Sequence, residues 1–354
     1  MFSFFVPLSA QTNNKQKKAD DYARQAVALI DDKQDYDGAI GLLEKALKLV
    51  PKSLIYQYEL AYTYYVKKDF AKAIKYLKKT LNKKDVVASH YQLLGNAYDL
   101  SDKTDKAEQI FLKGIKKFSD AGQLYVELGG IYYRQNNNDK AVAAWEQGIE
   151  NAPNFASNYY WASLLYCNSS EKIWGLFYAE IFLNLEPMTE RSDEISNLLY
   201  HTLRSGIRLA PTNEGRKLSF SERSRMFLLL EDEQNTKLPF QVLFDMNFAA
   251  GLGDYFEEIS IENIYQLKKL FINSWFERKY DKQYENVLFE WQKKIIEAGH
   301  FEAYCYWLLN LGNPKEFDNW LRKNEIIFRK FIVWMGKNHL RFDDKHKFYK
   351  LQYL

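Results

Sequence analysis

The chain has 354 residues, of which 47% are hydrophobic and 16% aromatic, and its formal net charge is only +3. This much apolar side chain excludes disorder over most of the length. The near balance of charge argues against a protein that follows a nucleic-acid backbone. No stretch of about 18 apolar residues is present, so the sequence predicts no membrane-spanning helix.

The first ten residues differ in character from the rest of the chain. Residues 1–10 read MFSFFVPLSA, and the polar stretch QTNNKQKK comes directly after them. An apolar stretch that ends in small residues before a polar switch is typical of the second half of a secretory signal, here with cleavage after Ala10. This pattern favours export to the periplasm of a Gram-negative bacterium. The positively charged start of a signal is missing, so an apolar tail on a cytoplasmic protein stays an alternative.

A 34-residue period runs through the next part of the chain. It links four alanines, and leucine, tyrosine and small residues follow the same step: Ala39, Ala73, Ala107 and Ala141; Leu60, Leu94 and Leu128; Tyr64, Tyr98 and Tyr132; Ala61, Gly95 and Gly129. A fixed period of this length marks one supersecondary unit copied in tandem. The period divides the region into five units, at residues 20–53, 54–87, 88–121, 122–155 and 156–189.

Each unit is expected to form two helices joined by a short polar turn. Apolar residues recur at steps of three and four, which is the helical period. Asp35, Asp69 and Asp139 lie at the turns and are expected to cap the second helix of their units. A proline ends the second helix in three units, at Pro51, Pro153 and Pro187. The sequence therefore predicts helical hairpins that stack on one another.

The pattern inside the units resembles the tetratricopeptide repeat. The unit at 122–155 carries its characteristic residues at Tyr125, Leu128, Gly129, Tyr132, Ala141, Trp145, Gly148 and Pro153. The units at 54–87 and 88–121 also match well, whereas the two outer units match more weakly. The resemblance implies an all-α fold, a right-handed superhelix of helical hairpins with a concave inner surface.

The period ends near residue 190, and residues 190–354 are predicted to form an irregular helical region. Ser219 and Glu222 form a candidate capping box, while Pro239 and Ser260 are candidate helix starts. The pattern favours irregular helical pairs that continue the solenoid, and a helical cap is the alternative. The two cysteines, Cys167 and Cys305, are far apart and are expected to be buried single thiols.

The first helix of each unit has a stripe that is expected to line the inner surface and to contact a partner. The residues selected from it are Arg24, Tyr58, Tyr62, Tyr65, Gln92, Asn96, Asp99, Tyr133, Arg134 and Tyr160, and Asp31 belongs to the same stripe. Tyrosines give large contact area at low entropy cost, and amides can bond to a peptide backbone. The sequence predicts a non-enzymatic scaffold that binds a peptide or helix of a partner protein. Two alternatives remain for the tyrosines, namely packing between units and stacking against a carbohydrate.

Other kinds of site find little support. Cytosolic co-chaperones of the family hold a C-terminal carboxylate with a Lys and an Asn on the first repeat and an Asn on the second. Arg24, Ala28 and Tyr62 stand at those positions, so that carboxylate clamp is not expected. The five histidines show no metal-ligand spacing, and no catalytic residue, metal or cofactor is predicted. An accessory subunit of an envelope enzyme, with a site in residues 190–354, stays an alternative.

Overall fold

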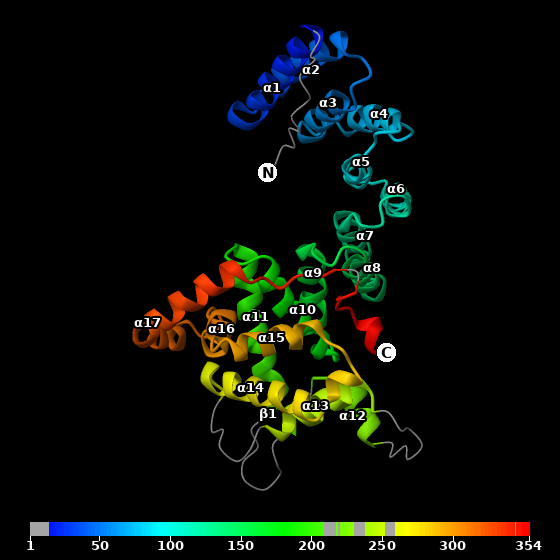
Figure 1. Ribbon diagram of the computed structural model, residues 1–354. Coiled ribbons are helices and arrows are strands. Elements are labelled where there is room, and N and C mark those ends of the chain that lie inside the picture. Colours follow the sequence, from blue (N-terminus) through cyan, green and yellow to red (C-terminus); the bar gives the residue numbers. More distant parts are fainter. Residues whose placement is uncertain (1–13, 209–216, 219, 230–237, 252–258, 344) are drawn as a thin grey trace. The chain divides into compact units, whose positions relative to one another are not determined.

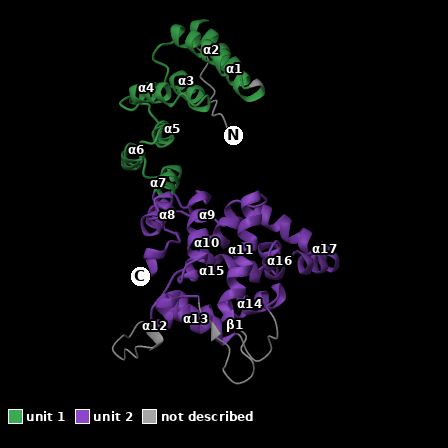
Figure 2. Ribbon diagram, turned by 180° about the vertical axis from the view of Figure 1, so that it is seen from behind, with its two compact units in different colours: residues 1–131 green, residues 132–354 purple. Residues whose placement is uncertain are grey.

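The computed structural model describes residues 14–208, 217–218, 220–229, 238–251, 259–343 and 345–354 (Figure 1). Contacts divide the chain into two compact units, at residues 1–131 and 132–354 (Figure 2). The candidate signal at residues 1–10 and the candidate cap Ser219 lie outside the described residues. The division into five repeat units and a C-terminal region stays a prediction.

The first unit is a row of helical hairpins. Its helices are α1 (Asn14–Lys33), α2 (Tyr36–Leu49), α3 (Leu54–Val66), α4 (Phe70–Thr80), α5 (Ala88–Asp99), α6 (Thr104–Lys117) and most of α7 (Gly122–Arg134). The helices α1 and α2, α3 and α4, and α5 and α6 pack as pairs, and α2 on α3 and α4 on α5 join the pairs. The helical-hairpin prediction is thereby confirmed.

Small residues on the 34-residue period allow this close packing. Ala39, Ala73 and Ala107 are completely buried. At Gly95 an added Cβ atom would overlap the ring of Phe111, which is itself buried. A side chain at this position would therefore push the two helices of the hairpin apart.

The turns between paired helices repeat as well. A residue with left-handed backbone follows the first helix of each hairpin, with φ of 52° at Gln34, 66° at Lys68, 58° at Asp102 and 58° at Asn136. These four positions are again 34 residues apart. In the second hairpin the Asp69 N–H donates to the Tyr64 carbonyl at 2.8 Å, which closes a Schellman-type helix end.

The caps predicted at Asp35 and Asp69 are confirmed, and the one at Asp139 is wrong. The Asp35 and Asp69 side chains accept hydrogen bonds from the N–H groups of Gly38 and Lys72. Asp139 instead lies in the first turn of α8, and the helix is capped by Asn137. Asn137 is the position that the 34-residue step reaches from Asp35 and Asp69, and its amide oxygen accepts from the Lys140 N–H at 3.1 Å as a carboxylate would.

The second unit holds the remaining helices around a large aromatic core. They are α8 (Asn138–Asn151), α9 (Ala156–Cys167), α10 (Lys172–Leu185), α11 (Glu190–Gly206), α12 (Glu222–Leu229), α13 (Phe240–Ala250), α14 (Ile261–Glu277), α15 (Val287–Glu297), α16 (Phe301–Leu309) and α17 (Pro314–Lys337), with short 3₁₀ turns at Tyr280–Lys282 and Lys350–Tyr353. Cys167 and Cys305 are buried free thiols, as expected. None of the described helices is long and apolar enough to cross a membrane.

The helix α10 is the centre of this unit. All of its residues from Ile173 to Leu183 are buried, because its sequence is apolar on every face. Glu180 on α10 accepts hydrogen bonds from Lys268 of α14 at 2.5 Å, Gln292 of α15 at 2.5 Å and Tyr304 of α16 at 2.8 Å. Helices α14, α15 and α16 therefore all contact α10 through this side chain, and the continuation of the solenoid as irregular helical pairs stays a prediction.

Two features of the second unit differ from the sequence-based expectation. A short antiparallel ladder pairs β1 (Ile207–Arg208) with β2 (Lys217–Leu218), a small exception to the all-helical fold.

The C-terminal segment, residues 338–354, returns to the start of the unit. Its Phe342 carbonyl accepts from the Asn154 side chain at 2.9 Å, and its Lys350 N–H donates to the Tyr178 hydroxyl at 3.0 Å.

Candidate functional site

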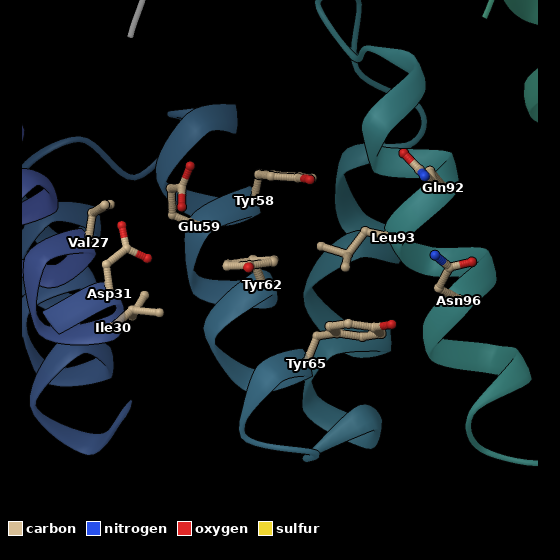
Figure 3. A pocket seen from close by; sticks show the side chains of 10 residues that line it. All are labelled: Val27, Ile30, Asp31, Tyr58, Glu59, Tyr62, Tyr65, Gln92, Leu93 and Asn96. Atoms are coloured by element: carbon tan, nitrogen blue, oxygen red, sulfur yellow. The ribbon is translucent and has the colours of Figure 1, made fainter. Parts of the chain in front are cut away.

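A groove of about 430 Å³ opens on the first unit, between the first helices of three successive hairpins. Because α1, α3 and α5 occupy equivalent places in their hairpins, side chains from equivalent helix faces meet there (Figure 3). The groove is lined by Val27, Ile30 and Asp31 of α1, by Tyr58, Glu59, Tyr62 and Tyr65 of α3, and by Gln92, Leu93 and Asn96 of α5. It combines apolar, aromatic and polar side chains, which is typical of a binding site.

Three half-buried tyrosines come from α3. Tyr58 packs against the His90 ring with 4.9 Å between ring centroids, and Tyr65 meets Phe70 edge-on at 5.7 Å. Both rings thus support the packing of the unit as well as lining the groove. Burial raises the pKa of Tyr58 to about 12 and raises the pKa of Tyr62, so these hydroxyls keep their protons at neutral pH.

Two carboxyl groups lie on facing helices of the groove. Burial, and then the negative charge of Asp31, raise the pKa of the half-buried Glu59 to about 7. In most proteins a nearby cation or several hydrogen-bond donors offset the desolvation cost of a buried carboxylate. Among the ten lining residues none is a lysine or an arginine. The groove is therefore a site in which negative charge is held without a lining cation.

The far side of the groove is formed by two amides. Gln92 donates to the Glu127 carboxylate of α7 at 2.9 Å, and Asn96 donates to the same oxygen at 3.1 Å. One acidic side chain thus holds both amide nitrogens, and the carbonyl oxygens of the amides remain acceptors.

Five of the ten residues predicted to contact a partner are brought together here, namely Tyr58, Tyr62, Tyr65, Gln92 and Asn96. That they bind a partner stays a prediction. The signal that groups them is the period itself, because equal positions in successive units project from equivalent helix faces.

Two other predicted residues of the first unit lie outside the groove lining. Arg24 is exposed and forms an ion pair with Asp21 one turn earlier on α1. Asp99, near the end of α5, accepts a hydrogen bond from the Thr104 hydroxyl at 3.0 Å.

The last three predicted residues belong to the second unit. Arg134 is exposed at the end of α7. Tyr133 is half exposed and lines a separate pocket of about 400 Å³ that also includes Trp145 and Trp161. Tyr160 is only 8% exposed, because α11 covers it: its hydroxyl bonds to Glu194 at 2.5 Å, so it offers a partner little surface.

Four residues that line the groove are not among those that the sequence predicts to contact a partner: Val27, Ile30, Glu59 and Leu93. Glu59 is the important omission. It precedes Tyr62 by three positions, so helical spacing places both on neighbouring parts of one face. An acidic residue at such spacing from a groove tyrosine is the signal that could have identified it.

A metal site finds no support in the part of the chain that the structure describes. No group of three or more His, Cys, Asp or Glu side chains there could hold a metal ion.

Comparison with known families gives two matches. Residues 32–114 match the family described as anaphase-promoting complex, cyclosome, subunit 3, and residues 93–156 match a tetratricopeptide repeat family. No curated protein sequence matches the chain.

Several solved structures are similar to this chain. A MamA protein structure is 26% identical, with 48% of this chain and 92% of that chain covered and a TM-score of 0.38. TTC0263, a thermophilic TPR protein of Thermus thermophilus, is 19% identical, with 51% and 98% covered and a TM-score of 0.41. YrrB, described as a TPR protein with an unusual peptide-binding site, is 18% identical, with 50% and 91% covered and a TM-score of 0.35.

The 34-residue period, the helical hairpins and the two family matches all indicate the same kind of structure, a row of helical repeats. Stacked repeats of this kind present extended surfaces that bind other proteins. Residues 32–156 therefore carry tetratricopeptide repeats, a repeat architecture that is typical of protein-interaction scaffolds.

Proposed function

We propose that the first unit binds a peptide or helical segment of a partner protein in the groove between α1, α3 and α5. The observation that carries the proposal is the gathering of three half-buried tyrosines and two amides around one cavity of about 430 Å³. Tyrosine rings give apolar contact with a polar tip, and the carbonyl oxygens of Gln92 and Asn96 can accept from a peptide backbone.

The proposal is tested by removing the central rings while the fold is monitored. The full chain and its Tyr58→Ala/Tyr62→Ala variant are used to capture proteins from an extract of the source cells, and the captured proteins are compared by quantitative mass spectrometry. A specific partner should fall by about tenfold or more in the variant, which corresponds to about 1.4 kcal/mol of lost binding. A Tyr22→Ala variant is the control, because Tyr22 lies on α1 beside Lys18 and Lys45 and outside the groove lining.

Melting followed by circular dichroism separates binding from folding. The double variant should keep a melting temperature close to that of the original chain. If it unfolds, the tyrosines are structural, and the milder Tyr62→Ala variant decides whether the groove binds. Equal capture by a folded variant would contradict the proposal.

Export is a second part of the proposal, and it rests on residues 1–10 alone. An apolar stretch followed by a polar switch supports a cleaved signal, which would place the scaffold in the bacterial cell envelope. The intact mass of the protein purified from a periplasmic extract should then correspond to a chain that begins at Gln11. Recovery of the uncleaved chain from the cytoplasm would contradict export.

A further inference from the structure

The groove lining has a different balance of charge from the rest of the first unit. The exposed faces of α2, α4 and α6 carry lysines together with some acids, whereas the ten groove residues include two acids and no base. We infer that the groove recognises a basic side chain, arginine or lysine, presented by the bound segment. This inference rests on the proposed function and names the chemistry that the segment must carry.

The two carboxyl groups supply the charge complementarity. Asp31 projects from α1 and Glu59 from α3, toward the space between these helices (Figure 3). Like charges in one cavity repel each other, and burial adds a desolvation cost. A guanidinium or ammonium group between them would relieve both costs, and its hydrogen bonds to the carboxylates would be charge-assisted.

The tyrosine rings suit the same ligand. A cation over an aromatic face gains about 0.5–1 kcal/mol at exposed sites and more when water is excluded. The second unit shows this arrangement within the chain itself. The Arg191 guanidinium lies 4.9 Å from the centre of the Tyr160 ring and is ion-paired with Glu186. In the groove, Tyr62 and Glu59 offer the same combination of ring and acid, and the bound segment would supply the cation.

The amides add hydrogen-bond acceptors to those that the two carboxyl groups provide. Glu127 holds the side-chain nitrogens of Gln92 and Asn96, so each amide turns its carbonyl oxygen away from that carboxylate. Carboxylates and amide carbonyls accept hydrogen bonds, whereas arginine has five N–H donors and lysine three. A segment that ends in a free carboxylate is disfavoured by the same lining, because its charge would face Asp31 and Glu59.

The test compares two peptides that differ in charge and hardly in shape. Acetyl-Ala-Ala-Arg-Ala-Ala-amide and the same peptide with citrulline are titrated into the full chain at pH 8, and binding is followed by saturation-transfer NMR. Citrulline replaces the guanidinium by a neutral urea group of nearly equal size. The arginine peptide should bind at least about tenfold more tightly, a difference of about 1.4 kcal/mol.

Variants assign the difference to the groove. Glu59→Gln should remove most of the preference for arginine and leave citrulline binding unchanged. Asp31→Asn is the second variant, in case Glu59→Gln disturbs folding. Glu44→Gln is the matched control, because Glu44 is exposed on α2 and does not line the groove, and it should leave both affinities unchanged.

Each contrary result has a distinct meaning. If both peptides bind equally and the Tyr58→Ala/Tyr62→Ala variant loses both, the groove binds peptides but the basic side chain is not what it recognises. If the arginine preference survives both acidic substitutions, the cation binds elsewhere and the inference is overturned. If neither peptide binds at ~10 mM, which corresponds to less than about 3 kcal/mol of binding free energy, the inference is also overturned. The capture experiment then decides separately on the proposed function.

Discussion

Glu59 has the most strongly altered chemistry among the groove residues. Its carboxyl group is half-buried, and the neighbouring titratable groups are Asp31 from α1 and Tyr58 and Tyr62 from α3. The pKa of Glu59 therefore rises from 4.5 to about 7. An acid with a raised pKa holds its proton in the folded chain at pH values where the unfolded chain has already lost it.

This shift predicts how the stability of the first unit depends on pH. Below pH 4.5 the group is protonated in both states, and between pH 4.5 and 7 the folded state binds more protons. The free energy of unfolding should therefore fall as pH rises from about 5 to 7.5. One pKa unit corresponds to about 1.4 kcal/mol, and partial access to water reduces the total to about 1–2 kcal/mol.

Urea unfolding followed by circular dichroism measures the effect. The Glu59→Gln variant should lose this part of the pH dependence, whereas Glu44→Gln should retain it. An unchanged pH profile in Glu59→Gln would show that the carboxyl group titrates normally.

The sequence predicted half of the candidate contacts for a simple physical reason. Helical spacing fixes which side chains share a face, and the repeat fixes which faces adjoin, so Tyr58, Tyr62 and Gln92 could be placed together. It could not predict that Tyr160 is covered. The covering helix α11 follows the last of the predicted units, and its Glu194 accepts a hydrogen bond from Tyr160, a contact that the period does not encode.

At the scale of the helical hairpin, the turn conformation is the most regular feature. The left-handed position after the first helix holds Gln34, Lys68, Asp102 and Asn136, none of which is glycine. Asparagine and aspartate tolerate this backbone better than lysine or glutamine do. Because glycine is absent from these positions, the left-handed backbone could not be predicted from the sequence, although the period placed the turns correctly.

Lys68→Gly should therefore stabilise the first unit. Glycine adopts a φ of 66° without strain, and the expected gain is about 0.5–1 kcal/mol after the greater entropy of the unfolded chain is subtracted. Lys75→Gly, an exposed position inside α4, should instead cost about 1 kcal/mol. Urea unfolding followed by circular dichroism distinguishes the two outcomes. A loss of stability in Lys68→Gly would contradict the claim that the left-handed backbone at position 68 is strained.

At the scale of the whole molecule, the second unit depends on the buried Glu180 cluster. Lys268 is the cation of this cluster, and its side chain is only 10% exposed. The cluster joins residues nearly 90 or more positions apart, so the local patterns of the sequence could not predict it. These long-range bonds hold α14, α15 and α16 against α10.

Lys268→Met should cost about 3–5 kcal/mol of stability, because it leaves the Glu180 carboxylate buried without a cation. The double variant Glu180→Gln/Lys268→Met should recover part of this loss. Lys269→Met is the control and should cost less than about 1 kcal/mol. All eight tryptophans lie in the second unit, so tryptophan fluorescence reports its unfolding selectively. If Lys268→Met is no less stable than Lys269→Met, the buried pair contributes little.

The central claim is that the partner binds in the first-unit groove, and site-specific photo-crosslinking tests it most directly. A p-benzoylphenylalanine is placed in turn at Val27 in the groove, at Lys75 on the outer face of α4 and at Tyr133 in the second unit. Each full-length variant is irradiated with the captured partner, and the crosslinked peptides are sequenced. We predict a crosslink from position 27 to a partner segment that contains arginine or lysine, and none from position 75. Crosslinks only from position 75 or 133 would place the partner elsewhere and contradict the claim.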